Sequence, residues 1–116
     1  MGKKDFKFNN MCEKRASVMK LKAGNEKLYK ERHDNIWPEM LDLMNKQGTH
    51  NFSIYRYGCL LFVYQERDTS IPEPDTIDPI IWKWWKMMAP LMETNSDYSP
   101  VTESLEEMFC FVKGKK

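Results

Sequence analysis

The sequence predicts an α+β domain of ferredoxin-like plan, in which one antiparallel sheet carries helices on one of its faces. Apolar patterns typical of strands and helices alternate along the 116 residues in the order strand, helix, strand, strand, helix, strand. No repeat or change in composition divides the chain, and a hydrophobic share of 41% is enough for one packed core. We therefore expect a single domain.

The first half of the expected domain follows a polar, basic leader at residues 1–15. An apolar segment at 16–21 predicts the first strand, and Asn25 is available to cap the helix that comes next. Pro38 interrupts this helix, because proline in a helix interior costs about 3 kcal/mol but is tolerated at the first helical position. A second helical segment is expected from Pro38 until Gly48 ends it.

The second half begins with two strand-like runs at 51–57 and 59–65, joined at Gly58 as in a hairpin. The remaining expected segments are a proline-rich loop at 68–79, a helix at 80–92, a strand at 108–112 and a basic tail at 113–116, which places the domain at residues 16–112.

The composition of two strands predicts a homodimer. Residues 59–64 and 108–112 are apolar at successive positions, so both faces of these strands favour burial. Two helices cover only one face, and apolar surface left in water costs about 25 cal/mol per Å². Pairing two sheets face to face removes this cost. The alternative is that these runs are inner strands of a monomer.

Charge and cysteine content restrict the partners and the compartment. Eighteen basic and seventeen acidic residues give a formal charge of +1, which argues against nucleic acid or an anionic membrane as a partner. Three cysteines, at 12, 59 and 110, form no CxxC pair and cannot complete a disulfide framework. The chain has no apolar run of membrane-spanning length and no signal-peptide pattern, so we expect a cytoplasmic protein.

Histidine is the first candidate for catalysis, because its imidazole titrates near neutral pH. His33 follows Tyr29 by four residues, so both side chains lie on one helix face. Because Pro38 ends the helix nearby, the helix dipole at His33 favours an imidazolium that could serve as a general acid. The alternative is that the pair only forms a hydrogen bond at the helix end. His50 is expected to be structural.

Tryptophans are concentrated in the helix expected at 80–92. Trp82, Trp84 and Trp85 could all be core residues. Adjacent helical residues point about 100° apart, however, so Trp84 and Trp85 cannot share one core stripe. The indole left outside the core is a suitable platform for a sugar ring.

Motifs of several other chemistries are absent from the sequence. It contains no HxxxH or CxxC metal spacing, no glycine-rich phosphate loop and no GxSxG elbow. Its carboxylates are scattered, so no glycosidase pair can be nominated. We expect no metal site.

Four segments in this order and spacing resemble the L-rhamnose mutarotase family: YKERHDNIWPEM at 29–40, GTHNFSIY at 48–55, WWKMM at 84–88 and DYSPV at 97–101. The resemblance extends over about residues 16–112. It implies a dimeric, ferredoxin-like α/β barrel that needs no cofactor. It also implies that His33 is the proton donor and that Tyr29, Trp84 and Trp85 contact the sugar.

The chain departs from the family pattern at two places. Phe52 stands where the family has a sugar-contacting tyrosine, so one hydrogen bond, typically worth about 1 to 3 kcal/mol when its partner stays buried and unpaired, is lost. The proline-rich stretch 71–79 replaces a helical pattern.

The function expected from these residues is an aldose mutarotase, which interconverts the anomers of a free sugar, L-rhamnose first, by acid/base-assisted ring opening. Two alternatives remain: a ligand-binding or oxidising dimeric barrel that holds haem or a quinone-like group, and a nucleic-acid module that stacks bases on its sheet.

Overall fold

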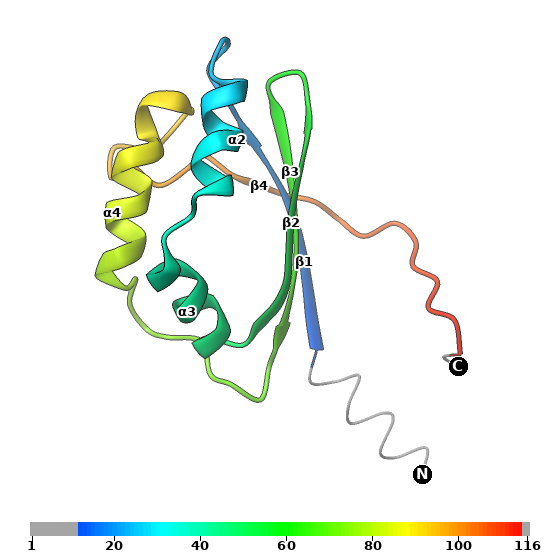
Figure 1. The fold of residues 1–116 in the computed structure, drawn as a ribbon. Coiled ribbons are helices and arrows are strands. Elements are labelled where there is room, and N and C mark those ends of the chain that lie inside the picture. Colours follow the sequence, from blue (N-terminus) through cyan, green and yellow to red (C-terminus); the bar gives the residue numbers. More distant parts are fainter. Residues whose placement is uncertain (1–11, 115–116) are drawn as a thin grey trace.

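The computed structural model describes residues 12–114 and forms two layers, a four-stranded antiparallel sheet and a layer of helices on one of its faces (Figure 1). The strand order is β2-β3-β1-β4, the order of a ferredoxin-like sheet, and it confirms the expected fold class. The elements are β1 (Cys12–Lys20), α2 (Glu26–Asp34), α3 (Pro38–Lys46), β2 (Thr49–Tyr57), β3 (Leu60–Asp68), α4 (Pro79–Met88), the 3₁₀ turn η1 (Ala89–Leu91) and β4 (Glu103–Ser104).

Most of the expected turns and breaks are confirmed. Pro38 is the first residue of α3, as expected, whereas the helix expected at 80–92 is α4, which begins one residue earlier at Pro79 and ends at Met88. Gly48 and Gly58 adopt positive φ angles of 89° and 60°, so they end α3 and turn the β2–β3 hairpin at low steric cost. The strand β1 begins at Cys12, within the segment expected to be a loose leader. The leader's first eleven residues lie outside the described part of the chain.

The core lies between the helices and the facing side of the sheet. Leu61 and Val63 of β3 point toward the helices and are almost completely buried, as is Met88 of α4. The core cluster also contains three residues near the ends of β1 and α4, namely Leu21, Leu91 and Met92. Since β3 is central and pairs along its whole length with β1 and from Leu60 to Arg67 with β2, the core is built on the strand with the most extensive pairing.

The expectation of a strand at 108–112 is wrong. The last strand is the short β4, and the hydrogen bond from the Leu105 amide to the Ala16 carbonyl ends its alignment with β1. Residues 106–112 are irregular and exposed, and they leave the sheet on the side opposite the helices (Figure 1). An extended run becomes a strand only where a neighbouring backbone pairs with it, and the described part of the chain provides none here.

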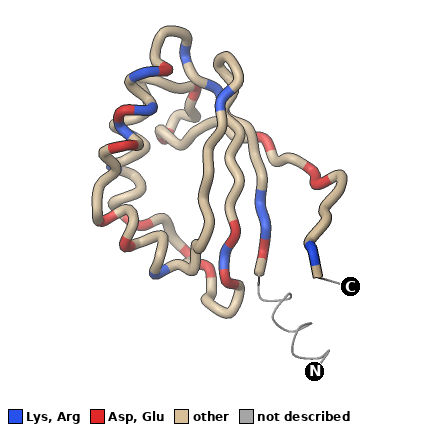
Figure 2. Tube along the Cα trace, turned by 45° about the vertical axis from the view of Figure 1, so that its right-hand side comes forward, with Lys and Arg blue, Asp and Glu red and all other residues tan. Residues whose placement is uncertain are grey.

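The other side of the sheet, which we call the outer face, carries no helix. Tyr55 and Tyr57 of β2 lie on it and are 70% and 79% exposed. Acidic and basic residues are interspersed along the chain, and neither sign forms a continuous face (Figure 2). Among residues 12–114, no helix has the length and apolar character needed to cross a membrane.

Candidate active site

The helix α2 holds the two residues that the sequence singled out. Tyr29 and His33 are one turn apart, and their ring centroids are 4.3 Å apart. Tyr29 belongs to the buried core cluster, whereas His33 lies half-buried in the last turn of the helix. The predicted pairing of phenol and imidazole on one face is therefore confirmed.

A hydrogen bond determines the tautomer of His33. Its Nδ1 lies 3.0 Å from the carbonyl oxygen of Tyr29. A carbonyl oxygen can only accept, so Nδ1 carries the proton in this bond. In the neutral ring Nε2 is then unprotonated and can accept a proton from a ligand.

The expectation of an imidazolium at this helix end is wrong. Burial lowers the pKa of His33 below its ordinary 6.5, and the hydrogen bond to Tyr29 and the nearby Asp34 carboxylate only partly oppose this effect. Desolvation disfavours the charged ring more than the hydrogen bond and the carboxylate favour it. Burial also raises the pKa of Tyr29 to about 12, so its phenol is a donor and not a base at neutral pH.

The helix α4 brings Trp84 against His33. The two rings meet edge to face with centroids 5.3 Å apart, and Trp37 meets Trp84 in the same manner at 5.1 Å. Trp84 is only 7% exposed, so it is mainly a core residue that supports the imidazole. Trp85 is half-buried and contacts Trp82 instead. The two adjacent indoles thus have different environments, as their 100° separation predicted.

Phe52 lies apart from this cluster in β2. It alternates with Ile54, which packs against the core, so both side chains are on the helix-covered side of the sheet. Phe52 is 43% exposed and forms no ring contact with the described aromatic residues. The structure therefore brings together Tyr29, His33 and Trp84, whereas Trp85 and Phe52 make no ring contact with His33.

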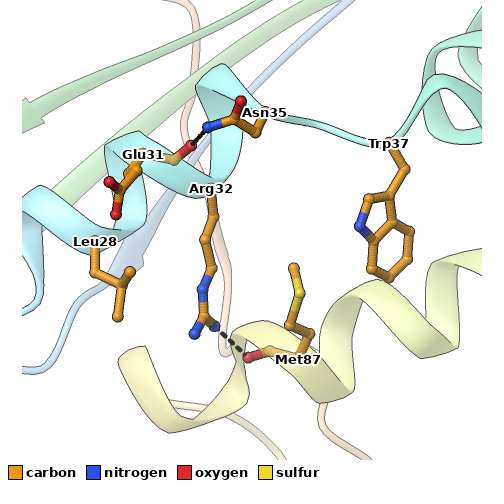
Figure 3. A pocket seen from close by; sticks show the side chains of 6 residues that line it. All are labelled: Leu28, Glu31, Arg32, Asn35, Trp37 and Met87. Atoms are coloured by element: carbon orange, nitrogen blue, oxygen red, sulfur yellow. Dashed lines mark hydrogen bonds between the residues drawn. The ribbon is translucent and has the colours of Figure 1, made fainter.

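A pocket of about 240 Å³ lies between α2 and α4, and Figure 3 shows the side chains around it. Arg32 crosses it and donates from Nη1 to the carbonyl oxygen of Met87 at 2.8 Å. Trp37, which contacts Trp84, lines the same pocket. Neither Tyr29 nor His33 lines it.

Sequence reasoning missed the roles of Arg32 and Trp37. The hydrogen bond of Arg32 links α2, which carries His33, to α4, which carries Trp84. Trp37 packs edge to face against the Trp84 indole. One sequence signal could have indicated these roles: both residues lie in the segment RHDNIW, which also contains His33.

This combination defines a class of protein: a ferredoxin-like domain whose helical layer presents a neutral histidine between a tyrosine and a tryptophan. The site contains proton-exchanging and aromatic groups suited to an uncharged, ring-shaped ligand.

Comparison with known proteins identifies the family. A family model described as L-rhamnose mutarotase matches residues 14–111, and the chain belongs to that family. L-rhamnose mutarotases of Listeria monocytogenes and Bacillus subtilis are 42% and 40% identical to it over 100 residues, which cover 84% of this chain and 96% of each relative. The crystal structure of L-rhamnose mutarotase from Formosa agariphila superposes with a TM-score of 0.77 at 37% identity, covering 86% of this chain and 99% of that one.

Proposed function

We propose that this protein interconverts the α and β anomers of L-rhamnose by opening and closing the pyranose ring. The observation that carries the proposal is the imidazole of His33, held beside Trp84 by the hydrogen bond between Nδ1 and the Tyr29 carbonyl, in a chain of this family. Such a group can exchange a proton with a sugar oxygen without a redox step.

In the proposed reaction, Nε2 of His33 takes the proton of the anomeric hydroxyl. The bond between C1 and the ring oxygen then breaks, C1 becomes a carbonyl carbon, and the imidazolium returns the same proton to the ring oxygen. Both oxygens are bonded to C1, so one nitrogen can reach both. After rotation about the C1–C2 bond, closure on the other face of the carbonyl reverses these steps and gives the other anomer.

Burial of His33 supports this shuttle. The resting ring is neutral and therefore ready to accept, and its lowered pKa makes the imidazolium a stronger acid in the return step. The Tyr29 carbonyl holds the ring in place, because its bond to Nδ1 is available in both protonation states. Trp84 packs edge to face against the imidazole ring and restricts its movement.

The remaining nominated residues bind the sugar in this proposal. The Tyr29 phenol, protonated at neutral pH, donates to a hydroxyl, and the exposed part of the Trp85 indole contacts the apolar face of the ring. Phe52 supplies a ring without a hydroxyl to the same side of the sheet.

The test is anomer exchange measured by saturation-transfer NMR on a panel of free aldoses, with L-rhamnose expected to exchange fastest over the uncatalysed rate. L-fucose, L-mannose and D-glucose test the 6-deoxy group and the ring configuration. Absence of acceleration for every sugar, by a folded protein, would refute the proposed function.

We further infer that the outer face pairs with a second copy of this chain. In residues 106–112 an apolar run is left in water, with Met108, Phe109 and Phe111 between 76% and 85% exposed. This run passes over the outer face, where it borders a groove of about 690 Å³ with Lys14 and Tyr64. Two such faces packed together would bury the tyrosines and the run at once.

Light scattering coupled to size exclusion tests this inference, and the dimer mass is expected. The double substitution Phe109→Ser and Phe111→Ser should lower the mass toward that of the monomer, whereas Phe52→Ser, on the other side of the sheet, should not. A monomeric wild-type protein would refute the pairing.

We also propose a cytoplasmic location, because Cys12, Cys59 and Cys110 are all free thiols. Fractionation of the native host should recover the protein with cytoplasmic markers. Recovery with an oxidising compartment would refute this location.

A further inference from the structure

Three potential metal ligands meet at the end of the outer face farthest from the Gly58 turn. Each residue offers one donor atom, and these atoms lie within 4.8 Å of one another: the residues are Cys12 of β1, His50 of β2 and Glu66 of β3. The residues are far apart in sequence, so strand pairing alone brings them together.

A bulge in β2 gives His50 its position. The pairing of β2 with β3 shifts by one residue between Thr49 and Asn51, which leaves His50 as the additional residue. A bulge redirects a side chain that regular alternation would send to the other face. The His50 imidazole therefore meets Glu66 and Cys12 on the outer face.

The separations of the donor atoms fit a tetrahedral ion. With bonds of about 2.0 to 2.1 Å to nitrogen and oxygen and about 2.3 Å to sulfur, tetrahedral zinc places its N and O donors roughly 3.3 Å apart and its N and S donors roughly 3.6 Å apart. His50 Nε2 lies 3.3 Å from Glu66 Oε1 and 3.7 Å from Cys12 Sγ. Both separations from the His50 nitrogen thus match those expected for ligands of one ion, and the cysteine sulfur and the carboxylate oxygen lie within 4.8 Å of each other.

A second residue orients the carboxylate. The Tyr64 hydroxyl donates to Oε2 of Glu66 at 2.6 Å, which leaves Oε1 facing His50. Metal-binding carboxylates commonly have such a partner.

The charges around the cluster favour a cation. Asp68 is the register partner of Cys12 and adds a negative charge beside it, although its carboxylate also accepts from Ser70. Lys14 faces Glu66 across the strands, but its ammonium is bound by Glu107 at 2.8 Å and is thus compensated.

We propose that Cys12, His50 and Glu66 form a binding site for a divalent transition-metal ion of the zinc class, with a fourth position open to water. A ligand set of one sulfur, one nitrogen and one oxygen suits zinc better than magnesium or calcium, which prefer oxygen alone. The ion would join β1, β2 and β3. The site is separate from His33, which lies in the helical layer.

Co²⁺ provides the direct test, because its absorption spectrum depends on its ligands and on their geometry. Titration of tag-free, reduced full-length protein with Co²⁺ should give one equivalent of tetrahedral d–d absorption and a thiolate-to-cobalt charge-transfer band. Cys12→Ser should remove the charge-transfer band, and His50→Asn should weaken binding at least about tenfold. Cys110→Ser is the matched control, since this exposed thiol contacts Lys14 and lies outside the cluster, and it should retain both signals.

Two further measurements distinguish a metal-binding site from three side chains that lie close together by chance. Tyr64→Phe leaves all three ligands but should weaken Co²⁺ binding about tenfold, because the Glu66 carboxylate loses the hydrogen bond that orients it. Zn²⁺ should raise the melting temperature of the wild type and Cys110→Ser, but not of Cys12→Ser. An octahedral spectrum, a charge-transfer band that survives Cys12→Ser, or no saturable binding would overturn the proposal, and none of these results bears on mutarotase activity.

Discussion

Replacing His33 by asparagine tests the proton shuttle most directly. General acid–base catalysis by one side chain contributes about 10²- to 10⁴-fold, which corresponds to about 2.7 to 5.4 kcal/mol of transition-state stabilisation. If Nε2 of His33 is the group that exchanges the proton, His33→Asn should reduce catalysed anomer exchange by at least that factor.

The structure indicates that the His33→Asn protein will fold. Asn35, the residue that follows α2, donates from Nδ2 to the carbonyl oxygen of Glu31 four residues back, at 2.9 Å. An asparagine at position 33 offers the Tyr29 carbonyl a donor of the same kind. The ring contacts to Tyr29 and Trp84 are lost, at about 0.5 to 1.5 kcal/mol each. This loss is smaller than the 5 to 15 kcal/mol that typically stabilises a domain.

Exchange between the anomers of L-rhamnose is measured by saturation transfer, with chelator present, and folding by circular dichroism and melting temperature. His50→Asn is the matched control, because it removes the other histidine, from the outer face, and should leave exchange unchanged. A folded His33→Asn protein with wild-type exchange would refute the assigned role of His33.

Four further predictions concern pH, specificity and stability. Since the neutral form of His33 accepts the first proton and its pKa is lowered, kcat/KM should be constant at neutral pH and fall only as pH drops below 6.5; a fall with a midpoint above 6.5 would contradict the effect of burial. Phe52→Tyr restores a hydroxyl on the helix-covered side of the sheet and should lower KM for L-rhamnose by about 5- to 150-fold, which corresponds to about 1 to 3 kcal/mol of binding free energy. An unchanged KM would show that residue 52 does not contact the sugar. Leu61→Ala should destabilise the fold by about 2 to 5 kcal/mol in urea unfolding, because Leu61 is 1% exposed, and a loss below 1 kcal/mol would contradict its central place in the core. Asp78 caps α4 by accepting from the Ile80 amide at 2.9 Å, so Asp78→Ala should cost about 1 kcal/mol, whereas a neutral effect would show that the cap is dispensable.

Local sequence signals predicted most of the fold. The breaks at Pro38 and Gly58 depend on the backbone of the residue itself, through a missing N–H and a positive φ, so they could be read without knowledge of neighbours. The pairing of Tyr29 with His33 also needs only helical periodicity. The prediction of a strand at 108–112 failed because a strand depends on a partner backbone, which an apolar pattern cannot supply.

By itself the sequence determined the order of the elements, the family and the nomination of His33, because these depend on residues close together along the chain or on ordered motifs. Only the tertiary structure decided the direction in which the pKa of His33 shifts, since the burial that lowers it comes from packing against other elements. The same is true of the meeting of Cys12, His50 and Glu66. Their proximity depends on the register of three strands and on one bulge, and no spacing in the sequence encodes it.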